Sequence, residues 1–192
     1  NFYMAAFADS LYAVNFAAKN GINKAKTLAI FKETYGNWKE ISAFIEMQKT
    51  DNKVLALEFL NTLTEKDLRD TKTDILNQHF STGLQSLPHY ISDTAFYTTY
   101  ILSPRINIEF IRPWRKELAD YFDKFRDGSQ IGTVINIRNW INDSIIIDNV
   151  GNMHSRSPLS PAGVLHLRVS DVRSRNIFVV AVCRSLNIPS RI

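Results

Sequence analysis

The most informative segment of the sequence is Asp171-Val-Arg-Ser-Arg-Asn-Ile-Phe-Val-Val-Ala-Val-Cys-Arg-Ser-Leu-Asn-Ile-Pro-Ser-Arg191. Its first residue can cap a helix, because an aspartate side chain accepts the free backbone N–H groups of a first turn. The apolar run from Ile177 to Cys183 leaves no polar face, which is typical of a buried helix. Asn187 tolerates the left-handed conformation of a helix end, and Pro189 prevents continuation. We therefore expect a helix over residues 172–186, followed by a strand that begins at residues 190–192.

Upstream of this helix, the spacing of apolar residues predicts further helices and few strands. Gly21 should end the first helix, and Thr64 to Asp67 resembles the start of another. We expect residues 86–114 to form a connecting wrap, with helices over residues 114–125 and 130–143, and residues 150–165 to be a loop. The expected apolar face of the helix over residues 130–143 consists of Ile131, Val134, Ile135, Trp140 and Ile141.

The composition is that of a globular protein, with 45% hydrophobic and 22% charged residues. The net charge is +4, but the sequence contains no basic run of the kind that supports nucleic-acid binding. This argues against a nucleic-acid partner. The single cysteine, Cys183, excludes an intramolecular disulfide and a zinc site built on cysteine pairs. No apolar run approaches the roughly 20 residues of a membrane span, so we expect no membrane-spanning segment. Because the chain begins with Asn1, we expect a processed form or a fragment.

The segment from Ala181 to Arg191 resembles the "ALxRALGIPAR" signature of the transglutaminase-like superfamily. Three further segments, upstream, resemble, in turn, the family's Trp-bearing helix, a stretch before the core in bacterial members with a helical N-terminal region, and the loop ahead of the nucleophile helix. They are Asn139-Trp140-Ile141, Tyr100 to Asn107 followed by Arg112, and Ser157 to Pro161. Together these segments extend the resemblance over roughly residues 90–192.

The resemblance implies a mainly α fold: a helical N-terminal region and then the helical half of a papain-like α+β transglutaminase core. The corresponding domains are residues 1–85, a wrap and helix over residues 86–129, and the truncated core over residues 130–192. In the family, the catalytic His and Asp come from strands after the signature, where this chain ends. We therefore expect the C-terminal helix to need cover, in part from a downstream part of the same protein.

The family's nucleophilic cysteine lies twelve residues before the signature arginine, which places Val172 at that position. The first turn of a helix suits a thiolate, because its free N–H groups and positive dipole end lower a thiol pKa. Valine has no nucleophilic atom. Cys183 lies eleven residues further along the same helix, roughly 16 Å away, and belongs to the apolar run. We interpret Cys183 as a core residue and expect no catalytic residue, cofactor or metal in this chain.

Two other sets of residues could form sites. The histidines, His79, His89, His154 and His166, all precede the signature, and their spacing matches no standard metal motif. Arg168, Arg173 and Arg175 flank the start of the C-terminal helix, with Ser174 between them, and a helix start with arginines around it can hold an anion. The alternative is that these arginines bond the chain's own carbonyls and acids, such as Asp171.

The leading hypothesis is a non-catalytic transglutaminase-like module with a binding or scaffolding role in a longer protein. The resemblance implies a bacterial, extracytoplasmic location and a peptide or cell-surface polymer as partner. One alternative is part of an active acyltransferase or cysteine peptidase whose catalytic residues lie outside this chain. Another is a helical adaptor in which residues 1–85 carry the function.

Overall fold

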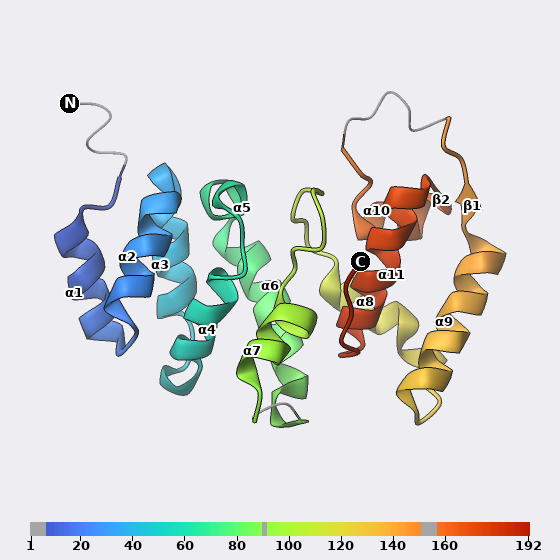
Figure 1. The fold of residues 1–192 in the computed structure, drawn as a ribbon, viewed down its shortest axis with the longest axis horizontal. Coiled ribbons are helices and arrows are strands. Elements are labelled where there is room, and N and C mark those ends of the chain that lie inside the picture. Colours follow the sequence, from blue (N-terminus) through green and yellow to red (C-terminus); the bar gives the residue numbers. More distant parts are fainter. Residues whose placement is uncertain (1–6, 90–91, 151–156) are drawn as a thin grey trace. The chain divides into compact units, whose positions relative to one another are not determined.

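The computed structural model describes residues 7–89, 92–150 and 157–192, and the fold is mainly helical, as predicted (Figure 1). The chain divides into two compact units, residues 1–80 and residues 81–192. The predicted division into three domains stays a prediction.

Unit 1 consists of short helices joined by tight connections. The elements are α1 (Ser10–Asn20), α2 (Lys24–Glu33), the 3-10 turn Tyr35–Asn37, α3 (Trp38–Glu46), the 3-10 turn Thr50–Asn52, α4 (Lys53–Leu60), α5 (Glu65–Asp70) and α6 (Thr73–Gly83), whose last residues belong to unit 2.

Local sequence signals set the helix ends of unit 1. Asp9 caps α1 by accepting the N–H of Tyr12, and Gly21 ends the helix with a φ of 66°, as predicted. Thr64 and Asp67 form a capping box at the start of α5, also as predicted. Because such caps satisfy the free groups at helix ends, these short helices can pack closely around a core of aromatic and aliphatic residues.

Unit 2 contains the two longest helices, α9 with 15 residues and α11 with 14, and a small sheet. Its elements are the 3-10 segment Leu84–His89, α7 (Thr94–Tyr97), a π-helical turn Thr98–Leu102, α8 (Arg115–Phe122), the 3-10 turn Asp123–Phe125, α9 (Gln130–Ser144), β1 (Ile146–Ile147), α10 (Pro161–Leu167), β2 (Val169–Ser170) and α11 (Val172–Ser185). The two strands pair in parallel, with Ile146 opposite Val169 and Ile147 opposite Ser170.

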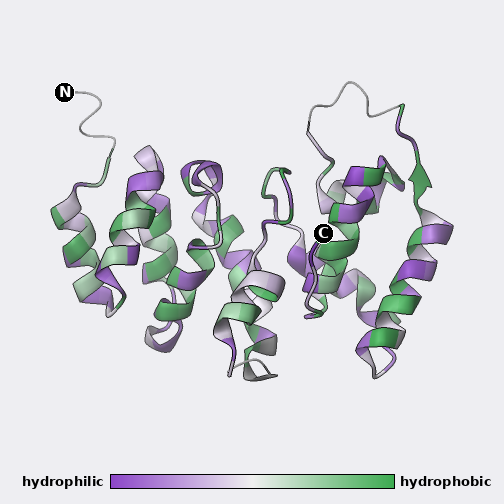
Figure 2. Cartoon of the chain, in the orientation of Figure 1, coloured by the Kyte–Doolittle hydropathy of each residue, from purple (hydrophilic) through white to green (hydrophobic). Residues whose placement is uncertain are grey.

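Helix α11 lies at the centre of unit 2, with contacts to α8, α9 and α10. Its apolar run appears green in Figure 2 and is buried among aromatic and aliphatic side chains of those helices. The predicted start at Val172 is confirmed, as is the left-handed stop at Asn187, which has a φ of 63°. Trp114, Phe122 and Phe178 are fully buried and supply much of this core.

Three predictions about unit 2 are wrong. Ile131, Val134 and Ile135 of α9 are exposed, whereas Ile141 is buried as predicted, together with Thr133 and Ile137. Of the loop expected over residues 150–165, residues 151–156 lie outside the described residues, and residues 161–165 belong to α10, which Ser160 caps and Pro161 opens. Residues 190–192 form no strand, because Ser190 donates its N–H to the carbonyl of Tyr100 instead of pairing in a sheet.

Candidate functional site

Val172 occupies the first turn of α11, where 44% of it is exposed. Two backbone N–H groups of this turn are in use. The N–H of Val172 donates to the side chain of Asn149 at 3.2 Å, and the N–H of Ser174 donates to Asp171 at 2.9 Å. The position predicted for a nucleophile is therefore an accessible helix start, but its side chain is aliphatic and has no titratable group.

Cys183 lies in the core near the other end of α11, as predicted. It is 5% exposed, and burial raises the pKa of its thiol to about 11. A thiol with this pKa is protonated at neutral pH, and only the thiolate is a good nucleophile.

Arg184, the arginine of the family-like signature, has a structural role. Its guanidinium donates to the carbonyls of Ser103 at 2.8 Å, Arg105 at 2.9 Å and Ser190 at 2.9 Å. These bonds tie the end of α11 to the segment after the π-helical turn. Burial lowers the pKa of Arg184 to about 10, so the side chain is a cation at neutral pH.

Arg115 is a second buried arginine, and it reaches the same segment. It donates to the carbonyls of Arg184 at 2.8 Å, Ile101 at 2.9 Å and Leu102 at 2.8 Å. Burial, with a smaller contribution from the nearby charge of Arg184, lowers the pKa of Arg115 to about 9. The two guanidinium groups donate hydrogen bonds to backbone carbonyls that are buried away from water.

The predicted anion site at the start of α11 is not assembled from all four residues. The hydroxyl of Ser174 donates to Asp171 at 2.7 Å and accepts the N–H of Leu159 at 2.9 Å. Arg168 bonds to Tyr121 instead. Arg173 is exposed and Arg175 half-buried, and an anion site at these two residues stays a prediction.

The four histidines have separate positions. His79 is buried in unit 1. His89 ends a 3-10 segment, and its side chain, like the whole of His154, lies outside what the structure describes. His166 lies on α10 and lines a pocket.

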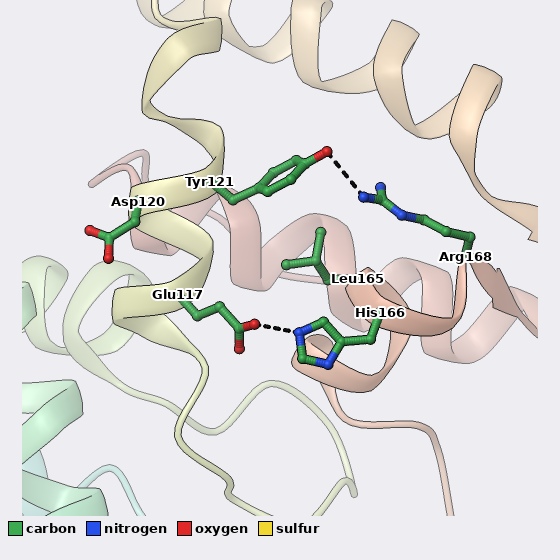
Figure 3. A pocket seen from close by; sticks show the side chains of 6 residues that line it. All are labelled: Glu117, Asp120, Tyr121, Leu165, His166 and Arg168. Atoms are coloured by element: carbon green, nitrogen blue, oxygen red, sulfur yellow. Dashed lines mark hydrogen bonds and ion pairs between the residues drawn. The ribbon is translucent and has the colours of Figure 1, made fainter.

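This pocket opens between α8 and α10 and has a volume of about 610 Å³ (Figure 3). Glu117, Asp120 and Tyr121 of α8 line one side, and Leu165, His166 and Arg168 line the other. Two interactions cross it: Nε2 of His166 bonds the carboxylate of Glu117, and Nη2 of Arg168 donates to the hydroxyl of Tyr121 at 3.0 Å. Figure 3 shows these two pairs at opposite ends, with Leu165 between them.

Arg168 is held in place from several directions. It follows α10 in the left-handed conformation, with a φ of 59°, which is unfavourable for a residue with a Cβ. Its guanidinium carbon lies 4.5 Å from the ring centre of Trp140 and 5.3 Å from that of Tyr121. Stacking on aromatic rings stabilises a guanidinium, so these contacts offset the backbone strain.

The hydrogen bond from Arg168 also changes the chemistry of Tyr121. It lowers the pKa of the phenol, and the charges of Arg168 and Lys124 act in the same direction against partial burial. Because a guanidinium can only donate, the phenol oxygen is the acceptor in this bond, and its own proton is available to another partner.

Of the residues that line this pocket, only Arg168 was predicted as a site residue. His166 was interpreted as structural, and Glu117 and Tyr121 were missed. The two missed residues lie four apart on one helix, so they share a face. That spacing alone does not indicate a pocket, because the pocket forms only where α10 packs opposite this face of α8.

No known protein family, curated protein or solved structure matches this chain. Within residues 7–89, 92–150 and 157–192, no helix has the length and apolar character to cross a bilayer. The same residues contain no group of three or more His, Cys, Asp or Glu side chains placed to hold a metal ion.

Proposed function

We propose that unit 2 is a transglutaminase-like module that binds a peptide or a cell-surface polymer and performs no thiol catalysis. The observation that carries the proposal is the placement of Val172 and Cys183 at opposite ends of α11. The helix start, which favours a thiolate, holds a valine, whereas the thiol is buried where its pKa is raised.

The role of Arg184 supports the same proposal. Because its guanidinium donates to backbone carbonyls, a structural role is sufficient to explain an arginine at this position of the signature, and no catalytic role is needed.

The first test is an activity assay of the chain with a glutamine-containing peptide and a primary amine. We expect no ammonia release and no amine incorporation, because no accessible thiol is present among the described residues. Turnover that disappears in a Cys183→Ala variant would contradict the proposal and favour the reading in which the chain is part of an active enzyme.

The second test asks whether position 172 is a nucleophile position. In a Cys183→Ala background, Val172→Cys should place a thiol with a pKa below the ordinary value of about 8.5, even though the Asp171 carboxylate opposes part of the effect. Leu167→Cys is a matched control, since residue 167 is 60% exposed and ends a helix, where the dipole acts in the opposite direction. Equal pKa values for the two thiols, measured by pH-dependent alkylation, would show that residue 172 is not such a position.

A further inference from the structure

The pocket between α8 and α10 contains donors and acceptors that the chain itself does not use. Tyr121 accepts a bond from Arg168, and its own proton meets no acceptor within the described residues. Glu117 uses one carboxylate oxygen for His166 and leaves the other without a hydrogen bond there. A pocket with an unused donor at one end and an unused acceptor at the other fits a ligand that carries the complementary groups.

The charges of the pocket are divided between its two ends. The Tyr121 end carries the guanidinium of Arg168, and the Glu117 end carries a carboxylate. Asp120 also lines the pocket, but its carboxylate points away from both pairs (Figure 3). The charge on Asp120 is partly balanced by Lys116, whose Nζ lies 2.6 Å from it. An ammonium group fits the acidic end, and a carboxylate fits the basic end.

This division also selects against other anions. A phosphate dianion bound at Arg168 would lie in the same pocket as two carboxylates, and like charges repel within a small site. A ligand with only a cation would leave the proton of Tyr121 unpaired. A ligand with both charges satisfies both ends.

We propose that the pocket between α8 and α10 binds a zwitterionic amino compound of the size of a dipeptide. Its carboxylate accepts from Tyr121 and faces Arg168, its ammonium donates to Glu117, and its side chain contacts Leu165. The volume of about 610 Å³ lies in the range of small-ligand sites. The inference rests on the binding role proposed above, but it does not depend on the absence of thiol catalysis.

The test uses the dipeptide alanylleucine, its N-acetyl form, its C-terminal amide and inorganic phosphate, titrated into the whole chain. We expect alanylleucine to shift the NMR signals of amides in α8 and α10. Each blocked form should bind about tenfold more weakly, or worse, because each loses a charge-assisted hydrogen bond. Phosphate should not compete.

Two variants locate the contacts. Tyr121→Phe keeps the ring that stacks on Arg168 and removes only the hydroxyl, and Glu117→Gln removes only the charge. Each should weaken alanylleucine binding about tenfold. Asp123→Asn is the matched control, because Asp123 is an exposed acid just after α8, bonded to Arg126 and outside the pocket. Thermal unfolding of each variant checks that the fold is retained.

Equal binding of the free and blocked dipeptides, competition by phosphate, or absence of shifts in α8 and α10 would each overturn the inference. None of these outcomes affects the thiol tests of the proposed function. Conversely, a chain with thiol turnover would refute the loss of catalysis and leave the pocket result intact.

Discussion

The two units of the chain stabilise their cores in different ways. In unit 1, the large buried side chains are aromatic and aliphatic, and Phe44, Phe59 and Phe80 contact one another with ring centres 5.5–5.6 Å apart. Unit 2 has such a cluster too, but it also buries Arg115 and Arg184. A core of hydrocarbon can be repacked with modest loss, whereas a buried cation bonded to carbonyls cannot be removed without orphaning them.

The largest effect should come from Arg115→Met, which replaces a buried cation by a side chain of similar length. The carbonyls of Ile101 and Leu102 lose the Arg115 donor, that of Arg184 keeps only the N–H of Asn187, and we expect unit 2 to lose about 3–5 kcal/mol of stability. Urea unfolding followed by NMR signals of each unit should show unit 1 unchanged. The control Arg138→Met alters an exposed arginine of α9 and should have little effect. Equal losses of stability in both variants would mean that the buried hydrogen bonds of Arg115 do not stabilise unit 2.

The next effect concerns pH and the thiol of Cys183. Its pKa is about 11 in the folded chain and about 8.5 when unfolded, so the unfolded state releases the proton first. The stabilisation is therefore complete below about pH 8.5 and is lost as the pH rises toward about 11, by about 3 kcal/mol in total.

The arginines titrate in the opposite sense, because burial lowers their pKa values. The thiol contribution must therefore be read as the difference in unfolding free energy between the native chain and Cys183→Ala at each pH. A difference that does not change between about pH 8 and about pH 11 would contradict the raised pKa.

A smaller loss is expected in unit 1 from Thr64→Ala. The hydroxyl of Thr64 donates to Asp67 at 2.8 Å and accepts the N–H of the same residue at 3.3 Å. Removing it should cost about 1 kcal/mol, measured by thermal unfolding. Thr50→Ala, at an exposed position of the same unit, is the control and should be near neutral. If both variants behave alike, local capping does not set the stability of unit 1.

The smallest effect should come from Ile131→Val on α9. Ile131 is 77% exposed, so losing a methyl group there should change stability by less than about 0.5 kcal/mol. The same change at Ile137, which is 1% exposed, should cost about 0.5–1.5 kcal/mol. The reverse order in a denaturant titration would restore the apolar face predicted from the sequence.

These differences explain which parts of the fold the sequence could predict. Caps and stops such as Asp171, Thr64 and Gly21 act within a few residues, so they can be read directly from the chain. The buried face of α9 could not, because isoleucines lie on more than one side of that helix and its neighbours decide which are covered. The start of α10 was predictable in principle, because Ser160 can cap a helix and Pro161 suits its first turn. The prolines and the glycine nearby made the same segment resemble a loop.

The candidate site was less predictable still. The contrast between Val172 and Cys183 follows from spacing along one helix, and it was predicted. The bonds of Arg115 join residues up to 69 positions apart, and the pocket joins Glu117 to a histidine 49 positions away. No local pattern encodes such pairings, since they arise only from the packing of α8 against its neighbours.

Arg168 connects the pocket to the small sheet. Its side chain reaches the pocket, while its backbone carbonyl accepts the N–H of Ile146 at 2.8 Å and so holds β1 to β2. A ligand that steadies the guanidinium would also steady this carbonyl. The hydrogen–deuterium exchange rate of the single Ile146 amide can then serve as a built-in gauge of pocket occupancy, read without attaching any label to the ligand.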